Sequence, residues 1–174
     1  MKKSVLAITF TSCFFAFNAQ ANTSSVTFSG TVTNVTCDTE ILTGGVATPS
    51  RQINLGTVGL GETGAPVTFK IQSIDPVNGG PCVSAQNGAT MLWTAANFDS
   101  NGLTNASGTA TGAYATILAK PTGGTAQLIT GPSPSVSFPS EDISTHGMTF
   151  DASLVGDTTP GTYTSVATYS IAYK

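Results

Sequence analysis

Apolar and polar residues alternate along much of the chain, a pattern that predicts β-strands with one buried face. The pattern is longest at the end of the chain, where no Gly or Pro interrupts residues 162–173. Because strand side chains alternate between two faces, one face of this stretch carries most of its apolar residues. These residues are Tyr163, Ala167, Tyr169, Ile171 and Tyr173. We therefore expect a strand from Gly161 to Lys174 whose apolar face packs against other strands.

Eight shorter segments upstream show strand patterning between turn sequences rich in Gly, Pro, Asn and Ser. They are residues 26–37, 51–58, 67–74, 89–95, 113–120, 126–129, 135–138 and 147–154. The residues expected to face a core are Ile53, Leu55, Val67, Phe69, Ile71, Met148, Phe150 and Leu154. No mature segment shows helical periodicity longer than two turns. Short strands at this spacing predict an all-β sandwich in a single domain.

The composition is typical of a protein that makes repeated close contacts with other subunits. Only 9% of the residues are charged, against about 25% in an ordinary soluble domain. The surface is therefore expected to be polar but largely uncharged. The chain has no basic cluster, so no nucleic acid is expected as a partner.

Residues 1–21 have the pattern of a cleaved secretory signal peptide. Two lysines precede an apolar stretch at residues 5–17, and an Ala-x-Ala cleavage sequence ends just before Asn22. The alternative is a membrane anchor, but a bilayer span needs about 20 apolar residues, and this stretch is shorter. Residues 22–174 are therefore expected to be an exported mature chain.

The mature chain keeps Cys37 and Cys82 after Cys13 is removed with the signal peptide. An even number of cysteines in an exported chain is typical of a disulfide. The loop closed by this bond would hold 46 residues (82 − 37 + 1), for which chain entropy gives a stabilisation of roughly 4 kcal/mol. Two free thiols are the alternative, which an oxidising exterior disfavours.

Residues 59–64 match G-x-G-x-x-G, the spacing of dinucleotide-binding loops. Such a loop needs a strand before it and a helix after it, so that the helix N-terminus meets the pyrophosphate. Here the following residues, 67–74, are predicted to form a strand. The match therefore indicates a glycine-rich turn, and no dinucleotide cofactor is expected.

His146 is the one histidine of the chain, and Asp142 or Asp151 could be its partner in a hydrolase. No serine lies in the sequence context of an activated nucleophile, and one histidine without suitably spaced ligands does not make a zinc site. Glu141 and Asp142 would point to opposite faces of a strand, unlike the paired acids of glycoside hydrolases. We interpret His146 as a surface residue and the acidic pair as a solvated patch, and we expect no catalytic residue, metal or cofactor.

A set of sequence features points to a known family. The features are the alternation at residues 26–32, Cys37, the segment Ile-Asn-Leu-Gly-Thr-Val at 53–58, Cys82, and a last strand with Gly161 fourteenth from the end and Tyr173 penultimate. In these features the chain resembles the subunits of chaperone–usher fimbriae, most of all the major subunits of enteric fimbriae. The resemblance covers nearly the whole mature chain, and its most specific elements are the two cysteines and the Gly161/Tyr173 spacing.

The resemblance implies an immunoglobulin-like sandwich that lacks its final, seventh strand. The gap would expose a hydrophobic groove beside the last strand. A periplasmic chaperone would lend a strand to this groove, and the N-terminal extension of the next pilin subunit, identical or related, would later replace it. This donor-strand complementation is a form of β-augmentation. The resemblance also implies an outer-membrane usher, export through the periplasm and an extracellular fimbrium as the final location.

Site residues follow from the resemblance. Residues 22–29 would be the N-terminal extension, with Val26 and Phe28 entering the groove of another copy, and residues 30–174 would be a single pilin domain. Groove and chaperone contacts are expected at Gly161, Tyr163, Tyr169, Ile171, Tyr173 and Lys174.

Two questions about the extension stay open on the sequence alone. Val26 and Phe28 could instead begin this molecule's own first strand, because alternation does not distinguish the two uses. Fifteen residues separate the expected cleavage point from Cys37, fewer than in many type 1-like pilins. The register of insertion is therefore open.

A carbohydrate-binding adhesin is a second functional class. Tip adhesins of this family carry an additional lectin domain, for which 153 mature residues (174 − 21) leave no room. Residues 97–112 are expected to form an exposed polar connection, flanked by Trp93 and Tyr114, where host glycans could still bind. A small secreted hydrolase is a third, disfavoured class. The favoured function is a structural, non-enzymatic subunit of a surface filament that supports adhesion.

Overall fold

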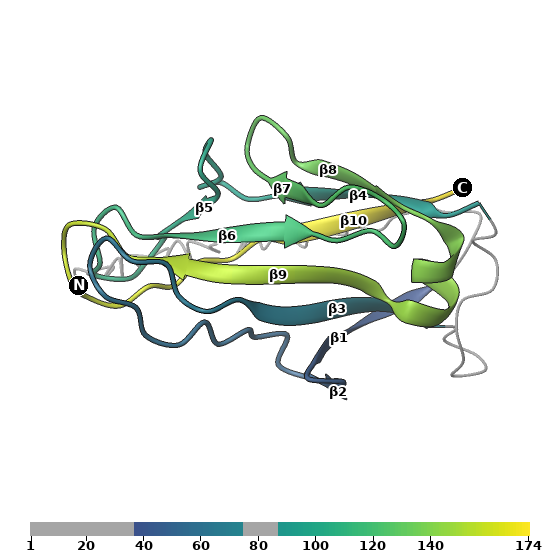
Figure 1. Ribbon diagram of the computed structural model, residues 1–174, viewed down its shortest axis with the longest axis horizontal. Coiled ribbons are helices and arrows are strands. Elements are labelled where there is room, and N and C mark those ends of the chain that lie inside the picture. Colours follow the sequence, from purple (N-terminus) through teal and green to yellow (C-terminus); the bar gives the residue numbers. More distant parts are fainter. Residues whose placement is uncertain (1–36, 75–86) are drawn as a thin grey trace, which may run out of the picture. The chain divides into compact units, whose positions relative to one another are not determined.

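A computed structural model of the chain describes residues 37–74 and 87–174 (Figure 1). These residues form two antiparallel β-sheets that face each other across one hydrophobic core. The prediction of an all-β fold is therefore confirmed.

The larger sheet has the strand order β2-β1-β3-β9-β6-β5, with β7 also paired to β6. Its strands are β1 (Asp38–Thr43), β2 (Val46–Ala47), β3 (Val67–Ile74), β5 (Leu103–Thr104), β6 (Tyr114–Ala119), β7 (Gln127–Ile129) and β9 (Met148–Val155). β5 and β7 pair with successive parts of one edge of β6, because β9 occupies its other edge.

The smaller sheet has the order β10-β4-β8. Its strands are β4 (Ala89–Thr94), β8 (Ser135–Phe138) and β10 (Thr168–Tyr173). A short π-helical turn, η1 (Asp142–His146), connects β8 to β9 across the end of the core. No helix in the described ranges is long and apolar enough to cross a membrane.

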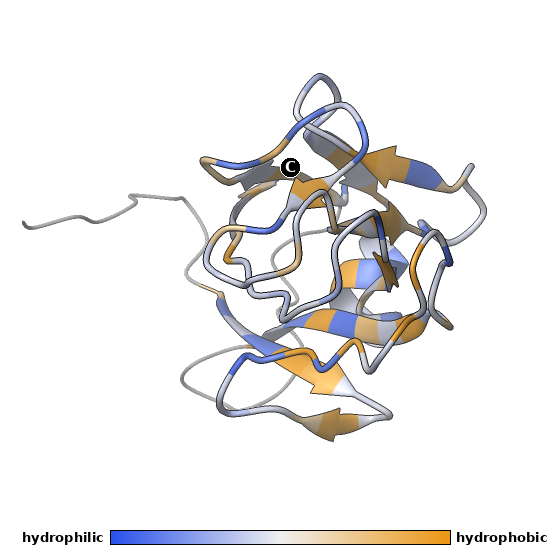
Figure 2. Ribbon diagram, turned by 90° about the vertical axis from the view of Figure 1, so that its left-hand side faces the viewer, coloured by the Kyte–Doolittle hydropathy of each residue, from blue (hydrophilic) through white to orange (hydrophobic). Residues whose placement is uncertain are grey.

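Aromatic side chains from both sheets meet at the centre of the core. Phe150 of β9 stacks on Phe69 of β3, with ring centroids 5.2 Å apart. From the smaller sheet, Trp93 and Phe138 each approach Phe150 edge-on at 5.4 Å. Buried and more exposed residues alternate along β3, β8 and β9, which supply the three phenylalanines, and Figure 2 shows hydrophobic and hydrophilic positions mixed along the strands. Each fully buried side chain of this kind stabilises the fold by about 1.5–3 kcal/mol.

Six of the strands predicted from alternation are present, with ends within two residues of the expected ones: β3, β4, β6, β7, β8 and β9. The expected core residues Phe69, Ile71, Met148, Phe150 and Leu154 are buried, and Val67 is half-buried. These strands were predictable because their own inward residues carry the pattern.

Two segments outside the predicted strands contain short strands. Residues 43–50, between the predicted strands at 26–37 and 51–58, include β2, which pairs with β1. Gly44 and Gly45 turn this hairpin with φ of 60° and 81°, a combination that favours glycine. Residues 97–112 include β5, whose Leu103 is buried. The predicted strand at 26–37 lies almost entirely outside the described residues.

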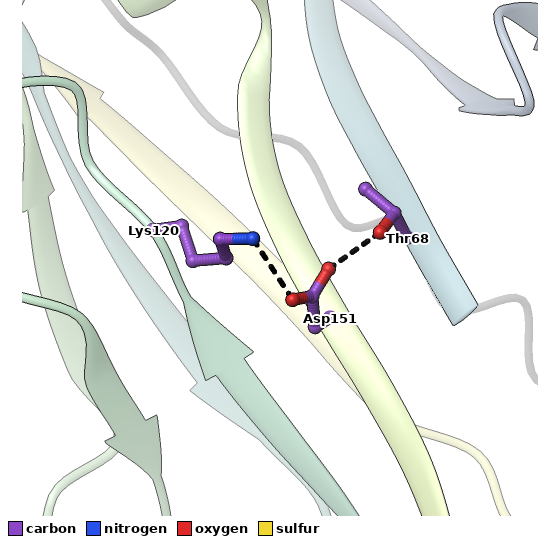
Figure 3. A network of polar contacts seen from close by, with 3 residues as sticks. All are labelled: Thr68, Lys120 and Asp151. Atoms are coloured by element: carbon purple, nitrogen blue, oxygen red, sulfur yellow. Dashed lines mark hydrogen bonds and ion pairs between the residues drawn. The ribbon is translucent and has the colours of Figure 1, made fainter. Parts of the chain in front are cut away.

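A polar network on the outer face of the larger sheet joins β3, β9 and the residue that follows β6 (Figure 3). The carboxylate of Asp151 on β9 accepts a hydrogen bond from the Thr68 hydroxyl of β3 at 2.6 Å and forms an ion pair with Lys120 at 3.0 Å. The Thr68 hydrogen bond and the nearby ammonium together hold the pKa of Asp151 below its ordinary value, although partial burial opposes them.

We predict that Thr68→Val raises the pKa of Asp151 toward the ordinary value of about 3.9, measured by NMR titration of the carboxyl carbon. Because the folded-state pKa is depressed, the contact stabilises the fold above the unfolded-state pKa, and this contribution is lost as the pH falls through the folded-state pKa. For a partly exposed pair we expect a loss of at most about 1 kcal/mol near pH 7. Thr90→Val, on the other sheet, is the matched control and should leave the Asp151 titration unchanged.

Candidate functional site

One edge of β10 has no partner strand among the described residues. Its other edge pairs with β4, from Thr168 opposite Thr94 to Tyr173 opposite Ala89. Lys174 continues this ladder, because its N–H donates to Gly88 O at 2.9 Å. Even-numbered residues therefore direct their peptide groups toward β4, and odd-numbered residues direct theirs toward the open edge. An unpaired row of peptide groups is a template for another strand.

The inward face of the last segment is only half-buried. From Thr162 to Lys174, odd-numbered residues are half-buried and even-numbered ones exposed, without a break. The inward residues of β3, β4 and β9 are by contrast nearly all fully buried. The predicted apolar face of the chain end therefore exists, but the core does not close over it within the described residues.

The strand expected at residues 161–174 is shorter than predicted. β10 begins at Thr168, and residues 161–167 pair with no named strand, although their alternating exposure continues that of β10. The reason is that β4 ends at Thr94, opposite Thr168, so no strand of the smaller sheet extends beside the preceding residues.

Residues 51–58 form the opposite wall and are also without a strand partner. They were predicted to form a strand, and Ile53 and Leu55 do pack against the core as expected. No described strand pairs with this segment, however. The predicted strand is therefore not formed within the described residues, because a strand is defined by a hydrogen-bonded neighbour as well as by its own alternation.

A groove of about 1070 Å³ lies between the two walls. Small and large apolar side chains both line it, the small ones including Ala113, Ala115, Ala152 and Ala167. The larger ones include Phe69, Trp93, Leu103, Ile117, Leu154, Tyr163 and Tyr169. The lining is therefore mainly apolar, with polar residues of both walls among it.

Three tyrosine hydroxyls tie the last segment to the larger sheet. Tyr163 donates to the carbonyl oxygen of Leu103 at 2.8 Å. Tyr169 shares a hydrogen bond of 3.0 Å with the Thr39 hydroxyl, and Tyr173 shares one of 2.8 Å with the Ser73 hydroxyl. These contacts hold the two sheets together on the side where a strand is lacking.

Burial raises the pKa of two of these phenols. It raises the pKa of Tyr163 to about 12. Burial also raises the pKa of Tyr173, although the hydrogen bond with Ser73 opposes the shift. Neither side chain therefore places a charge on the half-buried face of the last segment at physiological pH.

Residues 105–110 pack on the groove wall at residues 161–164. Ala106 N and Ala110 N donate to Thr164 O and Thr162 O at 2.9 and 3.0 Å. The side chain of Asn105 makes hydrogen bonds to both segments. This part of the connection at 97–112 is exposed at Ala106, Ser107 and Thr109, as predicted, but the prediction did not include its contacts with the chain end.

The structure weakens the basis for a glycan site beside this loop. Trp93 is 6% exposed and packs against Phe150 and Tyr169. Its ring faces are therefore taken by the core and do not offer a platform on which a sugar could stack.

The predicted site residues fall into three groups. Gly161, Tyr163 and Tyr169 line the groove. Ile171 and Tyr173 continue the same face of β10 but are not part of the lining, and Lys174 pairs with Gly88 as described above. Three predicted residues lie outside the described ranges: Val26, Phe28 and Cys82. Cys37 is disulfide-bonded, and its pairing with Cys82 stays a prediction.

The residues considered for chemistry are not brought together. His146 and Glu141 are exposed at η1 and beside it. Asp142 is buried, not solvated as we expected, because Thr122 donates to its carboxylate from both its N–H and its hydroxyl. Within residues 37–74 and 87–174 there is no group of three or more His, Cys, Asp or Glu side chains that could hold a metal ion. The glycine-rich turn at 59–64 leads into β3, as predicted.

Sequence reasoning missed three residues that support the groove: Thr39, Ser73 and Asn105. Ser73 and Thr39 lie on inward or edge positions of strands. The alternation pattern identifies inward apolar residues there and gives no indication that a hydroxyl makes a structural contact. Asn105 lies in a polar stretch without periodicity. A single sequence carried no pattern that would have indicated its partners more than 50 residues away at Thr162 and Thr164.

Comparisons with known proteins give two informative similarities. No model of a protein family matches the chain. The chain is similar to the F107 fimbrial protein of Escherichia coli, with 30% identity over 162 residues that cover 91% of each protein. Its fold is similar to the crystal structure of the P pilus rod subunit PapA, with a TM-score of 0.52 over 86% of this chain and 100% of that one. Sequence identity to that structure is 16%, so this likeness concerns the fold alone.

We predict that Tyr173→Phe lowers the free energy of unfolding by about 1–3 kcal/mol, because it leaves the buried Ser73 hydroxyl without its partner. The double variant Ser73→Ala/Tyr173→Phe should recover part of this loss, as measured in a urea-unfolding cycle. Tyr169→Phe is the comparison variant and should cost less, because Thr39 is only half-buried. Equal losses for the single and double variants would contradict a specific Ser73–Tyr173 contact.

Proposed function

The chain belongs to the family of chaperone–usher fimbrial subunits and is a structural pilus subunit, and from this premise we propose that it polymerises by donor-strand exchange. In this process, the groove beside β10 accepts an extended segment from another subunit. The associated subunits are related or identical pilins, and the assembled filament is an extracellular fimbrium. The role is structural, without catalysis or cofactor.

The open edge of β10 beside an apolar groove is the observation that carries this proposal. The odd-numbered residues from Tyr169 to Tyr173 offer peptide groups along an edge that no described strand occupies. The same residues leave an apolar face half-covered. An inserted strand would supply both missing partners, hydrogen bonds for the edge and apolar side chains for the groove, which is the recognition mode of β-augmentation.

Residues 22–29 of another copy are the proposed occupant. Val26 and Phe28 alternate with Thr27 and Ser29, so an extended segment would direct both apolar side chains to one face. The alanines of the groove lining support this choice, because small lining residues leave space for large inserted ones. The segment would run along the wall formed by residues 161–173.

Export and assembly factors complete the proposal. Residues 1–21 would direct the chain to the periplasm and be removed there, and residues 30–174 would fold as the pilin domain with a Cys37–Cys82 disulfide. A periplasmic chaperone would cover the open edge, with contacts extending to Tyr173 and Lys174, until an outer-membrane usher exchanges it for the next subunit. An apolar groove of this size would otherwise promote uncontrolled association.

On the donor side, we predict that Phe28→Asp abolishes filaments, because a carboxylate would have to enter an apolar groove without a partner. Electron microscopy of cells that produce the chain with its chaperone and usher measures the outcome. Thr27→Asp is the matched control and should leave filaments intact, because its side chain would face outward. Deleting residues 22–29 should have the effect of Phe28→Asp, and filaments that form without these residues would contradict the proposal.

On the acceptor side, we predict that Ala167→Phe fills the groove and lowers the affinity for an added peptide of residues 22–29 by at least about tenfold, equal to about 1.4 kcal/mol. Ala172→Phe is the matched control, because it makes the same change on the exposed face of β10. Peptide exchange into the chaperone-bound subunit, followed by fluorescence anisotropy, measures the difference. Equal affinities for the two variants would show that the groove is not the acceptor site.

A further inference from the structure

The acceptor edge of the proposed function extends beyond β10, and residues 105–110 make this possible. β4 ends at Thr94, opposite Thr168, so residues 161–167 have no strand of the smaller sheet beside them. Residues 105–110 take that place, because Ala106 N and Ser107 N donate to Thr164 O at 2.9 and 3.2 Å, and Ala110 N donates to Thr162 O at 3.0 Å.

The direction of these hydrogen bonds determines which side of the wall stays open. Thr162 and Thr164 bind residues 105–110 through their peptide groups, as the even-numbered residues of β10 bind β4. The peptide groups of Tyr163, Ser165 and Ala167 therefore point away from this loop, toward the groove. No described backbone group is hydrogen-bonded to these three N–H groups. The unpaired row of peptide groups thus continues from β10 along residues 163–167.

Asn105 is the side chain that joins the two segments. Its Oδ1 accepts from Gly108 N at 2.9 Å and from Thr164 N at 3.0 Å. Its Nδ2 donates to Ala110 O at 2.7 Å and to Thr162 O at 3.2 Å. Two hydrogen bonds thus hold its own loop and two hold the wall, which uses the full capacity of one amide.

Close backbone packing shows that this arrangement is specific. A Cβ added at Gly108 would lie 1.9 Å from Thr162 O, and one added at Gly161 would lie 2.5 Å from Ala110 N. Both distances are far shorter than any real contact, so only glycine fits at either position. The loop and the wall therefore meet backbone to backbone, in a single register that Asn105 maintains.

We propose that Asn105 is a positioning residue of the acceptor site, which holds residues 161–167 extended so that an inserted strand pairs with them as well as with β10. The inference rests on the proposed donor-strand function and adds a longer acceptor edge to it. Asn105 itself does not touch the inserted strand. It acts through the peptide groups of Tyr163, Ser165 and Ala167.

Hydrogen exchange in assembled filaments of the full mature chain tests the proposal. The amides of Tyr163, Ser165 and Ala167 report the contact with the inserted strand, those of Thr162 and Thr164 report the contact with the loop, and those of Tyr169 and Ile171 report insertion along β10. In the wild type we expect all three groups to be protected. In Asn105→Ala we expect the first group to exchange at least about tenfold faster, while Tyr169 and Ile171 stay protected.

Control variants separate this role from general stability. Asn101→Ala changes the same residue type at an exposed position of the same connection and should match the wild type. Asn105→Gln keeps an amide with both donors and both acceptors but places it one methylene further from the backbone, so its exchange should lie between those of wild type and Asn105→Ala. It also gives a readout if Asn105→Ala forms no filaments.

The outcomes distinguish the two proposals. In Asn105→Ala, faster exchange at Thr162 and Thr164 alone would show that Asn105 holds only the contact between loop and wall and does not position the acceptor edge, and would overturn the inference. Wild-type filaments with protected Tyr169 and Ile171 but unprotected Tyr163, Ser165 and Ala167 would also overturn it, and would leave donor-strand exchange standing. Wild-type filaments without protection at Tyr169 and Ile171 would overturn the proposed function itself.

Discussion

The unpaired edge of β10 is the constraint on which the rest of this structure depends. Peptide groups at a sheet edge need partners, and an apolar face left in water forgoes about 25 cal/mol for each Å² that could be buried. The described chain meets this demand only in part. Tyrosine hydroxyls reach across to the larger sheet, and residues 105–110 cover the outer side of the chain end. The side toward the groove is left for a strand that the described residues do not supply.

The two walls of the groove contribute differently to recognition. The wall at 161–173 offers a row of peptide groups, which bind any extended backbone with little regard to its sequence. Residues 51–58 contribute side chains such as Ile53 and Leu55 but belong to no described ladder, so in the proposed mechanism they would contact the apolar side chains of the inserted strand. The alanines of the lining would add a preference for large inserted side chains. Because the accepting groove and the proposed donor segment are different surfaces, such assembly does not close on itself and gives a linear filament.

Alternation predicted the fold where strands carry their own pattern. β3, β8 and β9 were located to within a residue or two because their inward positions are apolar. The same rule placed Ile53, Leu55 and the odd-numbered residues of the chain end on inward faces. It failed where structure depends on a neighbour: residues 51–58 have the pattern of a strand but no ladder, and β10 is shorter than its pattern because β4 ends at Thr94.

Polar contacts between distant segments could not be predicted from the sequence. Asn105 binds residues nearly sixty positions away, and Asp142 accepts from Thr122, twenty positions earlier. Neither contact produces a periodic pattern in the sequence. The Asp142 carboxylate, which was expected at the surface, is buried as a result of the second contact. A groove beside the last strand was implied by the family resemblance, whereas alternation alone marked the apolar face of that strand and not its incomplete burial.

An unfinished core links folding to assembly in the proposed mechanism. Inserting a strand would bury the inward face of residues 161–173 and pair its open edge in one event, so the stability of a subunit would depend on the occupant of its groove. Withdrawing the strand would break many hydrogen bonds and apolar contacts together, which makes dissociation slow even where equilibrium stability is modest. The tyrosine bridges and the Asn105 contacts would keep the acceptor shaped before the strand arrives. Less ordering would then remain for the binding step, which is how preorganisation raises affinity.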